Sequence, residues 1–292
     1  MNIKSFKPLL LIFILLETLV CQASINVVDS SGNVLTLNQS ARKIISMAPN
    51  ITELLFAIGA GSFVVGAAEF SDFPQKARLI TRVGGYQSFD FEKIITLKPD
   101  LVIAWQSGTP QTNIDKLKKL GIPVFITEAH KLEDIPILAE KLSRLTGTQT
   151  QAKLVIDTYK KHLQGLRQKF QNKNKVRVFY QIWQQPLMTV NSEHVIDQVI
   201  NACGGVNVFA DLKVLSGTVG LEDVLSRNPD VIIINDQGKR YDSWKKTWGK
   251  WKQLTAVQRK QIFSINPDII ARHSPRILSG ADEVCAILDK VR

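Results

Sequence analysis

The sequence predicts an α/β protein with two Rossmann-like lobes and one long connecting α-helix. Its length of 292 residues is long for one hydrophobic core and suits two. A helix-Pro-Asp-strand unit occurs twice in the chain, and a long amphipathic segment separates the two copies. Together these observations favour two lobes of similar construction joined by a helix.

The repeated unit is a short helix pattern that leads through a Pro-Asp pair into an apolar run. Such a run, directly after a turn, is typical of a buried parallel strand. Glu92 and Glu222 stand seven positions before the proline in their copies and are 222 − 92 = 130 residues apart. The matched spacing indicates a repeat, although Pro-Asp turns also recur by chance. The copies are FEKII and PDLVI at 91–95 and 99–103, and LEDVL and PDVIII at 221–225 and 229–234.

Strands and helices are expected to alternate in both halves, which gives mainly parallel sheets. In the first half the expected strands are 44–47, 64–68, 101–105 and 124–126, and the expected helices are 52–58 and 114–120. The second half repeats this alternation over 176–182, 195–202, 231–234 and 262–265.

Between the halves, residues 150–171 carry apolar side chains at a near three-to-four spacing, which predicts one helix of about six turns. We therefore divide the mature chain into an N-terminal lobe at 24–147, a connecting helix at 148–172 and a C-terminal lobe at 173–292. A single rigid connection predicts a small hinge motion. The apolar positions are Leu154, Val155, Tyr159, Leu163, Leu166 and Phe170.

Residues 1–23 have the three-part layout of a secretory signal peptide. Two lysines come first, an apolar run at 9–16 follows, and small residues close the segment. Cleavage is expected after Ala23, so the mature chain reaches the periplasm. Lipid attachment at Cys21 is the alternative, but Val20 stands where a lipoprotein has a small residue. No later segment approaches the roughly 20 apolar residues that a membrane-spanning helix needs.

Loss of the signal removes two lysines and one glutamate and leaves a net charge of 35 − 25 = +10. A strongly basic chain raises the possibility of nucleic-acid binding. The basic residues are scattered over predicted helices, however, as at 116–119 and 160–161, without interleaved arginines and aromatics or a nucleic-acid motif. We predict a solvated basic surface and no nucleic-acid partner.

Several motifs, in the same order, resemble those of the cobalamin-binding periplasmic proteins of ABC importers. The resemblance covers residues 44–288, nearly the whole mature chain. More broadly it places the chain among helix-bridged receptors for cobalamin, haem, siderophores and some metals. The motifs are IISMAPNITEL at 44–54, VG at 65–66, FSDFP at 70–74, LKPDLVIAW at 97–105, CGGVNVF at 203–209 and SPRI at 274–277.

The resemblance implies a corrinoid ligand in a cleft between the two lobes, clamped there by aromatic and loop residues. Capture of haem or a ferric siderophore is the alternative. Family tryptophans are replaced by Tyr86, Ser216 and Ile269, and a family tyrosine by Phe70. Phe70 and Tyr86 keep a flat apolar face. The implied ligand contacts are Phe70, Tyr86, Gln87, Trp105, Asp268, Ile269, Ile270, Ala271 and Arg272.

Tryptophans outside these motifs are further candidates. Trp183 follows the strand expected at 176–182, and ligands of parallel α/β lobes lie beyond the carboxyl ends of strands. It either replaces one lost aromatic or is a rim residue. Trp244, Trp248 and Trp251 are spaced as one helix face, which more often packs in a core.

The resemblance also implies three structural and docking roles. Cys203 and Cys285 match a disulfide-bonded pair, which the oxidising periplasm permits. Glu92 and Glu222 match glutamates that pair with arginines of an inner-membrane ABC permease. The alternative is that both glutamates only stabilise helix starts. We expect a monomer.

Catalysis and resident metal are not expected. Asn50, Thr52 and Glu53 resemble an acid-base set, but Thr52 and Glu53 are better explained as the start of a helix. No nucleophile elbow, Cys-His pair, phosphate loop or dinucleotide fingerprint occurs, so an uncharacterised enzyme is only the alternative class. The histidines lack paired ligand spacing, although His273 follows the predicted ligand loop, where a neutral imidazole can reach a bound cobalt or iron. They are His130, His162, His194 and His273.

Overall fold

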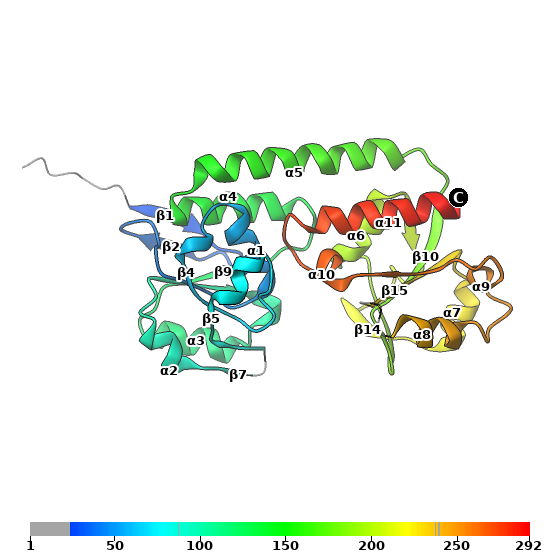
Figure 1. The fold of residues 1–292 in the computed structure, drawn as a ribbon, viewed down its shortest axis with the longest axis horizontal. Coiled ribbons are helices and arrows are strands. Elements are labelled where there is room, and N and C mark those ends of the chain that lie inside the picture. The colour runs from blue at the N-terminus through cyan, green and yellow to red at the C-terminus, as the bar shows by residue number, and fades with distance from the viewer. Residues whose placement is uncertain (1–23, 87, 237, 239) are drawn as a thin grey trace, which may run out of the picture.

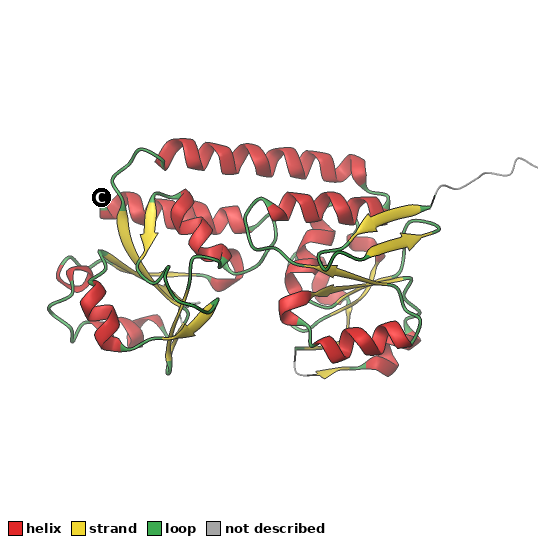
Figure 2. Ribbon diagram, turned by 180° about the vertical axis from the view of Figure 1, so that it is seen from behind, coloured by secondary structure: helices red, strands yellow, loops and turns green. Residues whose placement is uncertain are grey.

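The computed structural model describes residues 24–86, 88–236, 238 and 240–292, so the predicted signal peptide and Gln87 lie outside the described residues. Figure 1 shows two α/β lobes side by side, with helix α5 (Gln149–Phe170) running across both. Figure 2 shows the same arrangement from behind. The connecting helix predicted at 150–171 is thus confirmed within one residue at each end. None of the helices in the described part of the chain is long and apolar enough to cross a membrane.

The N-terminal lobe has a parallel five-stranded sheet in the order β5-β4-β3-β8-β9. Along β8, Leu101 and Ile103 belong to the core that contains α1, α4 and α5, whereas Val102 and Ala104 belong to the core that contains α2 and α3. Helices therefore cover both faces of the sheet, which explains its continuous apolar strands. The elements are β3 (Ile44–Ser46), α1 (Pro49–Ala57), β4 (Val64–Ala67), β5 (Thr81–Arg82), α2 (Phe91–Thr96), β8 (Leu101–Trp105), α3 (Gln111–Lys119), β9 (Val124–Thr127) and α4 (Asp134–Thr146).

The C-terminal lobe has a parallel four-stranded sheet in the order β13-β10-β15-β16. Its core continues through α5 into that of the N-terminal lobe, because Tyr159, Leu163 and Phe170 belong to one buried cluster with residues of both lobes. The elements are β10 (Val176–Gln181), α6 (Val195–Ala202), β13 (Gly205–Asn207), α7 (Leu221–Arg227), β15 (Val231–Asn235), α8 (Tyr241–Trp248), α9 (Thr255–Gln258), β16 (Ile262–Ile265), α10 (Pro267–Ile270) and α11 (Ile277–Val291).

The predicted repeat is confirmed at atomic detail. Lys98 and Asn228, 130 positions apart, both adopt a left-handed backbone with φ of 47° and 39°. The aspartates two positions later make the same contacts: Asp100 accepts the Lys43 N–H at 3.0 Å, and Asp230 accepts the Arg177 N–H at 2.8 Å. Each carboxylate thereby ties its own strand to the start of the neighbouring one. The lobes share this construction down to the turn that opens the central strand.

Short antiparallel pieces were not predicted. They flank the parallel sheets as β1 (Ile25–Val28) with β2 (Val34–Leu37), β6 (Gly84–Gly85) with β7 (Ser88–Phe89), and β11 (Trp183–Gln184), β12 (Leu187–Val190) and β14 (Ser216–Thr218). The tryptophan stripe is only partly helical, because α8 ends at Trp248 and Trp251 lies beyond it. Trp244 and Trp248 are buried, as expected for core residues.

The disulfide between Cys203 and Cys285 is present and joins the end of α6 to α11. It closes a loop with a sequence separation of 82 residues, and both cysteines are buried. On the chain-entropy model, such a cross-link stabilises the folded state by about 4 kcal/mol. We expect the Cys203→Ser, Cys285→Ser double variant to lose about that free energy of unfolding in urea titrations. The denatured, unreduced mature protein should contain no free thiol, and a count of two would contradict the prediction.

Candidate ligand-binding site

Three of the predicted aromatic contacts lie together in the N-terminal lobe. Phe70, Tyr86 and Trp105 line one cavity of about 650 Å³, which also contacts the loops that follow β3 and β4. The cavity therefore lies at the carboxyl edge of the parallel sheet, where α/β folds bind ligands. Phe70 and Tyr86 are 73% and 71% exposed. Aromatic side chains of this size are normally buried, so two exposed ones in one cavity indicate a binding surface.

Trp105 is held rigidly at the wall of this cavity. Its Nε1–H donates to Oε1 of Glu128 at 2.9 Å, and the other Glu128 oxygen accepts from the backbone and hydroxyl of Ser107 at 2.8 and 2.6 Å. Gly108 packs so closely on the indole that a Cβ there would lie 1.9 Å from Cε3. Since its N–H is already bonded, Trp105 offers a ligand only its ring.

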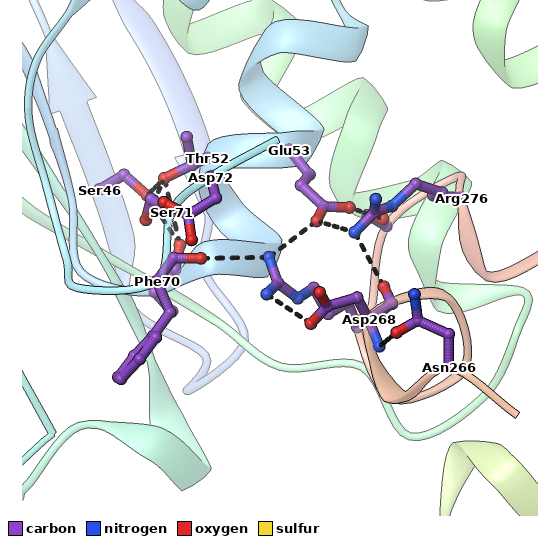
Figure 3. A network of polar contacts seen from close by, with 12 residues as sticks. Ser46, Thr52, Glu53, Phe70, Ser71, Asp72, Asn266, Asp268 and Arg276 are labelled. Carbon is purple, nitrogen blue, oxygen red and sulfur yellow. Dashed lines mark hydrogen bonds and ion pairs between the residues drawn. The ribbon is translucent and has the colours of Figure 1, made fainter. Parts of the chain in front are cut away.

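Phe70 adopts a left-handed backbone with φ of 62°, which is rare for a bulky residue. Its turn is fixed by neighbours: the Thr52 hydroxyl bonds Ser46 Oγ at 2.8 Å and Ser71 Oγ at 3.1 Å, all three buried. In Figure 3 the Phe70 ring points away from this polar network. The surrounding structure thus supports an unfavourable backbone conformation that leaves an aromatic ring exposed in the cavity.

A buried carboxylate joins the two lobes beside Phe70. Glu53 of α1, with 2% of its side chain exposed, accepts hydrogen bonds from three residues of the C-terminal lobe. These are Arg272 Nη1 at 3.0 Å, Ser274 Oγ at 2.6 Å and Arg276 Nη2 at 2.7 Å. Figure 3 shows Glu53 and Arg276 at the centre of this interlobe network. Charge-assisted bonds of this kind are about twice as strong as neutral ones.

The explanation of Glu53 as a helix-start residue is wrong. Helix α1 begins at Pro49, and its first turn contains no acidic residue. Glu53 lies further along the helix, on the side that meets the C-terminal lobe. The sequence reasoning assigned no role to Ser274 and Arg276, although both stand in a motif that carried the family resemblance. Their signal was the SPRI tetrapeptide directly after the predicted ligand loop.

The loop 268–272 contributes unequally to the interlobe surface. Arg272 donates to Asp268 Oδ1 at 2.7 Å and to the Phe70 carbonyl at 3.3 Å, so it links the loop to the aromatic cavity. Ile269 is half-buried and Ala271 is exposed, whereas Ile270 is fully buried in the core and supports the loop from beneath. The ligand contacts assigned to this loop remain predictions.

Burial lowers the pKa of two histidines near the interlobe surface. The His273 ring lies 5.7 Å from that of Trp105, centroid to centroid, and burial lowers the His273 pKa. Burial, with a smaller contribution from His273, lowers the pKa of His194 to about 4. His194 caps α6 by accepting the Ile196 N–H on Nδ1 at 3.2 Å, which requires an unprotonated nitrogen. Within the ranges that the structure describes, no cluster of three or more His, Cys, Asp or Glu could hold a metal ion.

Trp183 lies in the C-terminal lobe, where it is 43% exposed and lines a separate cavity of about 400 Å³. The structure thus gathers Phe70, Tyr86 and Trp105 into one cavity and places Trp183 in another. Glu92 and Glu222 are both exposed, at the second positions of α2 and α7.

Two α/β lobes, one connecting helix and an aromatic cavity beside the interlobe network define a helix-bridged solute-binding protein. The chain belongs to the periplasmic binding protein family, whose sequence profile matches residues 44–269.

Named relatives refine this assignment. The chain is 34% identical over 256 residues to the vitamin B12-binding protein of Vibrio parahaemolyticus, a match that covers 87% of this chain and 92% of that protein. A similar protein of Yersinia pestis is 34% identical over 247 residues, covering 85% of this chain and 86% of the relative.

Solved structures agree with these relatives. The crystal structure of the periplasmic vitamin B12 binding protein BtuF of Vibrio cholerae matches with a TM-score of 0.80 at 34% identity, over 86% of this chain and 98% of that one. The periplasmic heme-binding protein RhuT of Roseiflexus, at 22% identity and a TM-score of 0.77 over 87% of this chain and 100% of that one, shares the fold alone. The resemblance inferred from the motifs is confirmed.

Proposed function

We propose that this chain is a periplasmic substrate-binding protein that captures cobalamin or a related corrinoid and delivers it to an inner-membrane ABC permease. The observation that carries the proposal is the pair of exposed aromatics, Phe70 and Tyr86, in one cavity at the sheet edge. Flat apolar rings suit the face and edge of a macrocycle. The names of the relatives point to the same ligand.

Polar groups beside the cavity suit the rim of a corrin, which carries neutral amide side chains. Asp268 and Arg272 supply a carboxylate and a guanidinium at the lobe junction. Their mutual bond and the contact of Arg272 with Glu53 fix both groups before a ligand arrives. A preorganised polar rim lowers the entropic cost of binding. The proposed role is capture and release without chemical change of the ligand.

Calorimetric titration of the mature protein with cyanocobalamin, haem and a ferric siderophore tests this function directly. We expect one cyanocobalamin per chain, recovered unchanged after denaturation, and no saturable binding of the other two. Stoichiometric binding of haem or the siderophore alone would replace the proposed ligand. Conversion of any of them would indicate an enzyme.

The aromatic cavity makes a further prediction. Tyr86→Ala should weaken cyanocobalamin binding by about 1 to 3 kcal/mol, because a well-packed aromatic anchor is lost, and Phe70→Ala should act in the same direction. Leu79→Ala is the matched control, since Leu79 is 88% exposed but does not line the cavity. Affinities equal to wild type in both aromatic variants would remove these residues from the site.

A further inference from the structure

The C-terminal lobe has its own cavity at the carboxyl edge of its sheet. Trp183 follows the end of β10 by two residues, and Arg240 follows β15 by five. The neighbouring strand β16 leads from the same edge into the interlobe loop at 268–272. In Figure 1, α8 lies at the end of its lobe farthest from α5, as β7 does in the other lobe. The cavity of about 400 Å³ is lined by Trp183, Gln184, Gln185, Arg240, Ser243, Trp244 and Thr247.

A guanidinium lies against the rings of two indoles in this cavity. Cζ of Arg240 lies 4.5 Å from the Trp183 ring centroid and 5.2 Å from that of Trp244. The two indoles meet edge to face, with centroids 6.3 Å apart. Stacking on aromatic faces fixes a planar, weakly hydrated cation without neutralising its charge.

The nearest carboxylate, that of Asp236, mainly holds the backbone and makes one long ion pair with the cation. Asp236, with 1% of its side chain exposed, accepts the N–H groups of Gly238 and Tyr241 at 2.8 Å each. Its Oδ1 lies 3.8 Å from Nε of Arg240, beyond hydrogen-bond distance. The Arg240 side chain remains 48% exposed, and no carboxylate appears among the described residues that line the cavity. The Arg240 guanidinium is therefore a cation in a fixed position, and its N–H groups can donate hydrogen bonds to a ligand.

The neighbouring polar groups suit neutral amides. Nε2 of Gln184 donates to Thr247 Oγ1 at 3.2 Å, while its Oε1 is buried without a hydrogen-bond partner in the described part of the chain. A buried acceptor left unsatisfied is destabilising, so an amide N–H from a ligand would be favourable there.

We propose that Arg240, stacked on Trp183 and Trp244, binds a phosphodiester of the ligand. The proposal rests on the proposed corrinoid-binding function. Cobalamin carries one phosphodiester, in the loop that links its nucleotide base to the corrin, and neutral amides elsewhere. An arginine fork matches phosphate oxygens in a bidentate manner. The C-terminal lobe would thus distinguish corrinoids that have the nucleotide loop from those that lack it.

Two corrinoids test this selectivity: cyanocobalamin, and dicyanocobinamide, which lacks the nucleotide loop and its phosphodiester. Calorimetry with Arg240→Gln should show about a tenfold higher Kd for cyanocobalamin, as expected for the loss of a charge-assisted bond, and less than about a twofold change for dicyanocobinamide. Arg240→Lys should fall between, because it keeps the charge without the stacked fork. Arg259→Gln, at an exposed arginine that does not line the cavity, should change neither affinity.

The remaining outcomes separate this inference from the proposed function. Equal weakening of both corrinoids in Arg240→Gln, or of neither, would overturn the phosphodiester contact while corrinoid binding stands. Wild-type protein that binds neither corrinoid would overturn the proposed function and this inference with it. Saturable binding of inorganic phosphate at micromolar concentration, with an unchanged corrinoid ratio in the variant, would assign the cavity to the free anion instead.

Discussion

Glu53→Ala is expected to lower the free energy of unfolding by about 3 to 5 kcal/mol, because it leaves two buried cations without their shared carboxylate. Arg272 and Arg276 have only 16% and 20% of their side chains exposed, and both donate to the same Glu53 oxygen. Without Glu53 these guanidinium groups would repel each other in a poorly hydrated interface. Urea titration followed by circular dichroism measures the loss.

The same substitution should also weaken ligand binding, since Arg272 depends on Glu53 for its position beside Phe70. Glu53→Gln should be milder than Glu53→Ala, because the amide keeps the volume and one acceptor. Glu283→Ala is the matched control: Glu283 is an exposed glutamate of helix α11. If Glu53→Ala unfolded at the same urea concentration as Glu283→Ala, the interlobe network would not stabilise the protein.

The parts of the fold that could be predicted from the sequence are the strands buried on both faces of their sheet. Strands β8 and β16 were predicted at their observed limits, because a parallel strand covered on both faces is a continuous apolar run between turn signals. The small antiparallel pairs were not predicted from the sequence, because strands of two to four residues are too short to show an alternating pattern.

The residues of the aromatic cavity were proposed from the family resemblance alone, and their contact with a ligand stays a prediction. Phe70, Tyr86 and Trp105 were carried over by position and share one cavity. Glu53 was misread because its partners lie at least 219 residues further along the chain, outside any window that a local pattern can cover. Local sequence shows a glutamate in a helix. Only the packing of the lobes shows that this glutamate is buried and bound to two arginines.

The sequence pointed to only one of the two main residues of the C-terminal cavity, Trp183 but not Arg240. Trp183 was a candidate because it follows a buried strand, and the structure places it at the carboxyl edge of that strand's sheet. Its partner Arg240 lies 57 positions later, after another strand, and no spacing rule links the two. Trp183 and Arg240 follow the adjacent parallel strands β10 and β15, and the loops after adjacent parallel strands lie close together. The contact between the cation and the indole could therefore be recognised only once the strand order was known.

The largest expected effect on transport comes from the two exposed glutamates, Glu92 and Glu222. Helix α2 is already capped by Asp90, whose side chain accepts the Lys93 N–H at 2.9 Å, and Asp223 accepts the Gly220 N–H at 3.0 Å at the start of α7. Within the described residues, neither Glu92 nor Glu222 has a hydrogen bond or ion pair through its carboxylate. The helix starts therefore have other caps, which favours an external partner for both glutamates.

We expect the Glu92→Lys, Glu222→Lys double variant to fold and bind ligand normally but to lose transport, because like charges facing each other across an interface cost several kcal/mol. Uptake of labelled cobalamin by cells, and association of the purified receptor with its permease in detergent, measure the effect. The Glu140→Lys, Glu283→Lys variant makes the same change in net charge at exposed positions of α4 and α11, near α5 in Figure 1. This control should transport normally. Wild-type uptake and association in the Glu92→Lys, Glu222→Lys variant would rule out docking through these residues. Equal impairment of both double variants would show that the change in net charge, rather than its position, causes the loss of transport.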